Sequence, residues 1–129
     1  MPALALLLAA ALQAAPAPAP AAPAQPPRPV RDLASYVGAG DYPRRALRAL
    51  GASTVYFELI VAPSGRVAQC RVTRSSGATD LDLLTCRIIV ARARFRPARD
   101  AAGAPVEGRY ASNMTWSIPG RRNRNRRRP

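Results

Sequence analysis

The chain has 129 residues, enough for one domain, and carries twenty basic side chains against seven acidic ones. All twenty are arginine and six of them lie in residues 121–129, so the rest of the chain holds +7 of the net charge of +13. The sequence has no histidine, no CxxC pair and no glycine-rich phosphate loop, so we expect no enzyme activity, no metal site and no cofactor.

The chain begins with an uncharged apolar run from Ala3 to Ala15, interrupted only by Gln13. This run is shorter than the roughly 20 residues of a membrane-spanning helix, and it fits the apolar part of a signal peptide. We therefore predict a signal peptide over residues 1–14, cleaved after Ala14. An Ala-rich leader on a cytosolic protein is the alternative. Residues 15–30 are rich in Ala and Pro, a composition that favours polyproline II and predicts a short spacer.

The core domain is expected over residues 31–120, and its first element is a short helix. Asp41 is the predicted N-cap, and Pro43 fits the first turn because its missing N–H is not needed there. Leu47 and Leu50 can face a sheet, and Gly51 is the expected C-terminal stop.

A β-hairpin follows the first helix. Residues 54–62 alternate strictly, which predicts a half-buried strand, and Pro63-Ser64-Gly65 is a turn signal. Residues 66–73 form the returning strand, with a β-bulge expected near Ala68 because Val67 is out of phase. One face of the first strand carries Val55, Phe57, Leu59 and Val61, and the other face carries Thr54, Tyr56, Glu58 and Ile60.

A second helix is predicted after Ser75-Ser76-Gly77, which breaks the strand. Thr79 and Asp82 have the spacing of a capping box. The helix should run to about residue 92–94, because Pro97 prevents continuation. Its expected apolar stripe, with Cys86 and Ile89 at the flanks, consists of Leu81, Leu84, Ile88 and Ala91.

The last element is a strand over residues 110–118, preceded by a small-residue loop over 100–107. The element order is therefore helix, strand, strand, helix, strand. We predict an α+β fold with two layers, in which two helices pack on one face of a three-stranded antiparallel sheet. One face of the last strand should carry Tyr110, Ser112, Met114, Trp116 and Ile118.

Cys70 and Cys86 are the only cysteines. Without histidine, two thiols make a poor zinc site, which needs four ligands. A disulfide closing a loop of about 15 residues would stabilise the domain by roughly 3 kcal/mol. Two buried, reduced thiols are the alternative.

Several short motifs of the chain, together with their order and spacing, resemble those of the TonB C-terminal domain family. They cover about residues 41–118 and include the strand VYFELIV. The others are Tyr42-Pro43, Ser64-Gly65-Arg66-Val67, Ser75-Ser76-Gly77, Leu81-Asp82, Phe95-Arg96-Pro97-Ala98 and Gly103-Ala104-Pro105-Val106. The resemblance implies a non-catalytic domain in the periplasm of a Gram-negative bacterium. It also implies that the cysteine pair marks a disulfide-bearing subgroup.

The resemblance further implies a partner, the extended N-terminal segment of an outer-membrane receptor, bound by strand addition in support of import. The receiving edge in the family is the last strand, which here contains no Pro or Gly. A strand without a ligand, with Trp116 packed on the second helix, is the alternative. The expected peptide-binding residues are Tyr110, Ala111, Ser112, Asn113, Met114, Thr115, Trp116 and Ser117.

Energy transducers of this family start with a membrane-spanning helix that couples to a proton-driven complex of the inner membrane. The N-terminal run of this chain does not predict such an anchor, so we do not expect that coupling.

Residues 121–129 contain no hydrophobic side chain and are expected to form a disordered tail. The tail could bind anionic envelope lipids, or it could be solvated without a partner. Polyanion binding, including nucleic acid, is the alternative function, although an exported protein seldom meets nucleic acid. Its arginines are Arg121, Arg122, Arg124, Arg126, Arg127 and Arg128.

Overall fold

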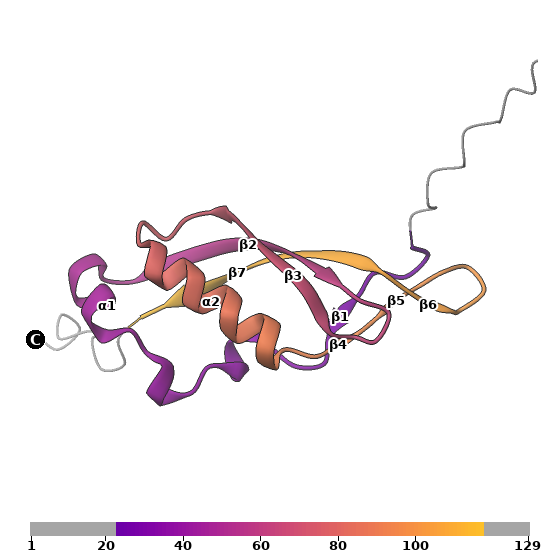
Figure 1. The fold of residues 1–129 in the computed structure, drawn as a ribbon, viewed down its shortest axis with the longest axis horizontal. Helices are drawn as coiled ribbons and strands as arrows, with labels where there is room; N and C mark the ends of the chain where they lie inside the picture. Colours follow the sequence, from indigo (N-terminus) through magenta and orange to yellow (C-terminus); the bar gives the residue numbers. More distant parts are fainter. Residues whose placement is uncertain (1–22, 118–129) are drawn as a thin grey trace, which may run out of the picture.

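A computed structural model describes residues 23–117, and these residues form two layers (Figure 1). One layer is a three-stranded antiparallel sheet in the order β3-β2-β7, made of β2 (Ser53–Val61), β3 (Val67–Arg74) and β7 (Gly108–Trp116). The other layer contains α1 (Arg44–Leu50) at one end of the sheet and α2 (Thr79–Arg92) across it. This arrangement confirms the predicted α+β fold and its element order.

The central strand β2 follows the predicted alternation. Its side chains Val55, Phe57, Leu59 and Val61 are buried and form the middle of the core. In the pairing of β2 with β3, Ile60 lies opposite Gln69 and Val61 lies opposite Val67. Ala68 is therefore left without a partner, which confirms the β-bulge expected there.

The turn between β2 and β3 requires glycine at position 65. Gly65 has φ +85°, a conformation that other residues adopt only with strain. A Cβ atom at this position would also clash with the carbonyl oxygen of Phe95. The Phe95 amide donates to the Gly65 carbonyl at 2.9 Å, so the hairpin turn is fixed against the chain that leaves α2.

The predicted start of α1 is wrong. The helix begins at Arg44, and its cap position is Pro43, which provides no side-chain hydrogen bond. Asp41 belongs instead to the 3-10 helix η2 (Ala39–Asp41), and its carboxylate accepts hydrogen bonds from Arg92 and from the Gly38 amide. The Asp41 carboxylate is engaged in a two-point pair with Arg92 and therefore does not cap α1. The C-terminal stop at Gly51 is confirmed, with φ +71°.

The predicted capping box of α2 is also wrong. Thr79 is the first helical residue, Ala78 is the cap residue, and no side chain caps the helix. The Asp82 carboxylate reaches back to Ser75 and Ser76 instead, because it finds two hydroxyl donors and an amide donor there.

The apolar stripe of α2 differs in part from the prediction. Leu81 and Ile88 are buried and Leu84 is partly buried, but Ala91 is exposed. Ile89, expected at the flank, is fully buried, and so is Thr85, which the stripe did not include. The polar Thr85 can face the core because its hydroxyl is hydrogen-bonded there.

The segment before α1 is more ordered than the sequence indicated. Strand β1 (Arg28–Pro29) pairs with β4 (Phe95–Arg96), and Gln25 exchanges backbone hydrogen bonds with Arg99. The 3-10 helix η1 (Leu33–Tyr36) then packs on the core. The C-terminal part of the expected spacer therefore belongs to the fold, because it completes two short ladders.

The expected loop over residues 100–107 is partly a hairpin. Strand β5 (Ala98–Arg99) pairs with β6 (Pro105–Val106), and β7 begins two residues after β6. Asp100 stabilises the turn because its carboxylate accepts from the amides of Ala102 and Ala104, both at 2.9 Å. This Asx-type turn replaces the irregular loop that the small residues predicted.

The two layers are joined covalently. Cys70 of β3 and Cys86 of α2 form a disulfide with Cα atoms 5.5 Å apart, which confirms the pairing and excludes the reduced alternative. The bridge closes a loop with a sequence separation of 16, so its expected stabilisation stays near 3 kcal/mol.

The predicted signal peptide, the first half of the spacer (residues 15–22) and the arginine tail lie outside the described residues. Among residues 23–117, no helix combines the length and hydropathy needed to cross a membrane.

Candidate functional site

The β7 strand is hydrogen-bonded along one side only. All nine of its residues pair with β2, from Ser53 opposite Trp116 to Val61 opposite Gly108, with no shift in register. Within residues 23–117, no other segment forms a backbone hydrogen bond with β7. Because successive residues of an antiparallel strand direct their N–H and C=O groups to opposite sides, about half of these groups face outward. The free edge of β7 is about 30 Å long.

Two aromatic contacts hold this strand in place. Tyr110 meets Phe95 edge to face with ring centroids 5.2 Å apart, and Trp116 meets Tyr42 in the same way at 5.5 Å. Both partners belong to motifs that the sequence resemblance depends on. The motifs therefore support the two ends of β7 rather than lining its free edge.

Trp116 is further fixed by a buried hydrogen bond. Its Nε1 donates to the Thr85 hydroxyl at 2.9 Å, and that hydroxyl donates to the Leu81 carbonyl at 2.8 Å. Trp116 and Thr85 are both almost completely buried. Thr85 was missed in the sequence analysis, although a hydroxyl side chain four residues after Leu81 on an apolar helix face is a usable signal.

The Ser75-Ser76-Gly77 motif forms a clip with Asp82 at the start of α2. The Asp82 carboxylate accepts from the Ser75 hydroxyl, from the Ser76 amide at 2.9 Å and from the Ser76 hydroxyl at 2.7 Å. Burial raises the pKa of Asp82, but these hydrogen bonds outweigh it, so the pKa lies below its ordinary value. The clip fixes the N-terminal end of α2, the helix that carries Thr85.

A second clip holds the other end of α2. Arg92 donates to both carboxylate oxygens of Asp41, at 2.7 and 3.0 Å, and to the Tyr36 carbonyl at 3.0 Å. Hydrogen bonds from Arg92 and the Gly38 amide lower the pKa of Asp41 from 3.8 to about 2. This pair connects the two 3-10 helices to α2.

The outer face of the sheet is polar and charged. Glu58 of β2 accepts from Arg109 of β7 at 3.0 Å and from Arg71 of β3 at 3.5 Å. Thr54 and Thr115 share a hydrogen bond at 2.9 Å across the same two strands, β2 and β7. These cross-strand pairs keep β2 and β7 in register without covering the free edge.

The residues predicted for peptide binding lie together, with one exception. Tyr110 through Trp116 belong to β7, whereas Ser117 follows the last strand residue. Asn113 and Thr115 are exposed, while Met114 and Trp116 point into the core. No group of three or more His, Cys, Asp or Glu side chains in residues 23–117 is arranged to hold a metal ion.

These features define a small two-layer domain whose sheet has one regular edge, β7, without a second backbone partner in residues 23–117. Residues 39–118 match the model of the family described as Gram-negative bacterial TonB protein C-terminal, and the chain belongs to this family. Domains of this family are periplasmic, non-catalytic and involved in interaction with outer-membrane receptors.

A solved structure supports the same assignment. The C-terminal domain of TonB from Pseudomonas aeruginosa, determined by solution NMR, is similar to this chain with a TM-score of 0.52 and 25% sequence identity. The alignment covers 74% of this chain and 90% of the Pseudomonas chain. A search of curated proteins found no match.

Proposed function

We propose that this domain binds an extended peptide segment of an outer-membrane receptor by adding it as a fourth strand beside β7, in support of import. The observation that carries the proposal is the free, nine-residue edge of β7. An unpaired strand edge offers a row of N–H and C=O groups that an extended peptide can satisfy.

The sheet has two edges, and their geometry favours β7 over β3. The pairing of β3 with β2 is interrupted by two register shifts, which leave Ala68 and Thr73 without partners. Such irregularities bend a strand and disfavour the addition of another one. The β7 edge has a uniform register from end to end, so a straight peptide can pair along its length.

The side chains of β7 suit a strand that stays soluble while one edge is open. Met114 and Trp116 are buried, and Tyr110 is half-buried against Phe95. On the opposite face Asn113 and Thr115 are exposed and polar. A rigid strand with few exposed apolar groups can receive a ligand with little reorganisation and little self-association.

Proline substitution at consecutive positions tests the edge. Of the two adjacent N–H groups at Ser112 and Asn113, only one faces outward. We therefore expect one of the variants Ser112→Pro and Asn113→Pro to leave the fold intact and abolish binding. The other variant should destabilise the pairing with β2. The measurement is capture of receptors from outer-membrane extract, identification of the captured receptor, and calorimetric titration with its synthetic N-terminal peptide.

Thr73→Pro is the matched control, because it places proline on the other edge of the sheet at a residue without a partner in β2. If Thr73→Pro abolishes peptide binding while both β7 variants stay folded and still bind the peptide, the site lies on β3 and the proposal is contradicted.

A further inference from the structure

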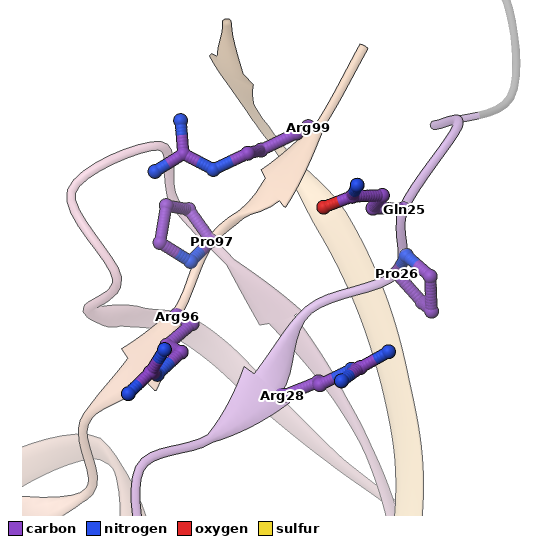
Figure 2. Close-up of a pocket in the computed structure, with 6 residues that line it drawn as sticks. All are labelled: Gln25, Pro26, Arg28, Arg96, Pro97 and Arg99. Carbon is purple, nitrogen blue, oxygen red and sulfur yellow. The ribbon is translucent and has the colours of Figure 1, made fainter. Parts of the chain in front are cut away.

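A hollow lies at the end of the molecule where β1, β4 and β5 meet. Its volume is about 490 Å³, within the range of small-ligand sites. Figure 2 shows that one stretch of chain supplies Arg96, Pro97 and Arg99, and that its neighbour supplies Gln25, Pro26 and Arg28. No residue of β7 lines it, so this hollow is separate from the proposed peptide site.

Strand pairing places like charges opposite each other in this hollow. Arg28 of β1 is the direct partner of Arg96 of β4, and Gln25 is the partner of Arg99. Like charges at directly opposite positions of a strand pair are destabilising, and an anion that contacts both side chains reduces their repulsion. A bound anion would therefore favour this arrangement.

The three arginines of the hollow lack acidic partners in the described part of the chain. The ion pairs of residues 23–117 involve Arg71, Arg92 and Arg109. The Arg99 guanidinium donates to the Gly103 carbonyl, at 2.8 Å, and forms no ion pair in the described part of the chain. Asp100, the nearest acid in sequence, uses its carboxylate for the turn amides.

Backbone hydrogen bonds join the two chain segments that line the hollow. Gln25 and Arg99 exchange two backbone hydrogen bonds of 3.0 Å, and the Val30 amide donates to the Arg94 carbonyl at 2.8 Å. Pro27 is buried against Gly108, where a Cβ atom would come within 2.9 Å of the proline ring. The backbone at Arg28, Arg96 and Arg99 is thus fixed by the fold, and their exposed side chains extend from it.

We propose that this hollow binds a ligand carrying several phosphate groups. Guanidinium groups present planar sets of donors that match phosphate oxygens, and the polar side chains here contribute donors together with one amide oxygen. Figure 2 shows the three guanidinium groups spread around the hollow rather than meeting at one point. This spread suits a ligand with more than one anionic group, either a soluble oligophosphate or the headgroups of an anionic lipid surface.

The test is a titration of the isotope-labelled full chain with inorganic pyrophosphate, followed by NMR. We expect the amide resonances of Gln25, Arg28, Arg96 and Arg99 to shift. The triple variant Arg28→Gln/Arg96→Gln/Arg99→Gln should bind at least about tenfold more weakly, because charged hydrogen bonds are lost. Pyrophosphate should also raise the Tm of the wild-type chain and not that of the variant.

The matched control is Arg44→Gln/Arg45→Gln/Arg48→Gln, which removes the same charge from exposed positions of α1 and should leave the affinity within about twofold. Equal weakening by both triple variants, or shifts confined to other arginines, would show unspecific charge attraction and overturn the proposal. If circular dichroism shows that the triple variant no longer folds, the single variants Arg96→Gln and Arg99→Gln are tested instead. Each of them should weaken binding.

The source of the phosphate groups is distinguished by vesicles. If the full chain binds phosphatidylglycerol vesicles, and the first triple variant loses this binding while the α1 variant keeps it, the site is assigned to lipid headgroups. Pyrophosphate binding without site-dependent vesicle binding would assign it to a soluble ligand. Absence of both kinds of binding would refute the inference.

Discussion

Thr85 connects the helix layer to β7 through a single hydroxyl group. It accepts from Trp116 Nε1 and donates to the Leu81 carbonyl, so neither the indole nor the hydroxyl is left without a partner in the core. Trp116 in turn packs on Tyr42. The C-terminal end of β7 is thus positioned by one residue of α2 and one residue near α1.

Replacing this hydroxyl should destabilise the domain without changing its shape. Thr85→Val conserves the side-chain volume but leaves Trp116 Nε1 buried and unpaired, so we expect a loss of about 1–3 kcal/mol. Urea unfolding followed by tryptophan fluorescence measures the change. The control is Thr79→Val, an exposed threonine of the same helix, for which we expect a change within about 0.5 kcal/mol. Equal losses in both variants would contradict the role of the Thr85 hydroxyl.

Among the elements, the hairpin of β2 and β3 shows how a turn limits what its strands can do. Gly65 lets the turn fold back against Phe95, and the bulge at Ala68 follows within three residues. The turn and bulge distort the β3 edge while leaving the β2–β7 ladder regular. Part of the asymmetry between the two sheet edges therefore originates at this turn, and a second register shift, at Thr73, adds to it near the other end of β3.

A comparison of Gly65 with Gly103, which lies in the turn between β5 and β6, separates the conformational demand of the β2–β3 turn from its steric demand. Gly65 and Gly103 have nearly the same φ, +85° and +83°, but only Gly65 has neighbouring atoms where a Cβ would be. We expect Gly103→Ala to cost about 1 kcal/mol, from the left-handed backbone alone. Gly65→Ala should cost about 1–3 kcal/mol more because of the clash with Phe95. Comparison of urea midpoints tests this, and similar losses would show that the turn can move away from β4.

For the whole molecule, α2 is the element to which the other parts are attached. The Ser75-Ser76-Gly77 segment is clipped to its start through Asp82, and the disulfide joins its middle to β3. The two 3-10 helices are joined to its end through Asp41 and Arg92. Two of these three connections depend on ionised carboxylates, so the stability of the whole domain should depend on pH.

Both carboxylates have a pKa below the unfolded-state value near 3.8, with that of Asp41 at about 2. Their ionised forms therefore stabilise the folded chain above about pH 4, and this contribution is lost as the pH falls toward 2. We expect the Tm of the wild-type chain to fall over this range, and that of Asp41→Asn/Asp82→Asn to start lower and fall less.

Asp80→Asn is the matched control for charge, because Asp80 is exposed on the same helix and makes no ion pair in the described part of the chain. Its Tm should follow the wild-type profile between pH 5 and about pH 2. A double variant that follows the wild-type profile as closely as Asp80→Asn does would show that the two clips do not stabilise the domain.

The sequence by itself determined the features that depend on local pattern. Strict alternation marked β2 and its two faces, glycine and proline marked turns and the C-terminal ends of the helices, and the two cysteines marked the disulfide. The order of short motifs was sufficient for the family. These signals are readable because periodicity, turn chemistry and cysteine number are properties of neighbouring residues.

Only the tertiary structure decided which groups meet across the chain. Asp41 and Asp82 are plausible helix caps in sequence, but Arg92 and the serines compete for them once the chain is folded. The pairing of residues 25–29 with 95–99, which brings three arginines around one hollow, has no local signature. The regularity of β7 and the irregularity of β3 are likewise properties of strand register. Register is set by contacts between distant residues, and a single sequence does not display those contacts.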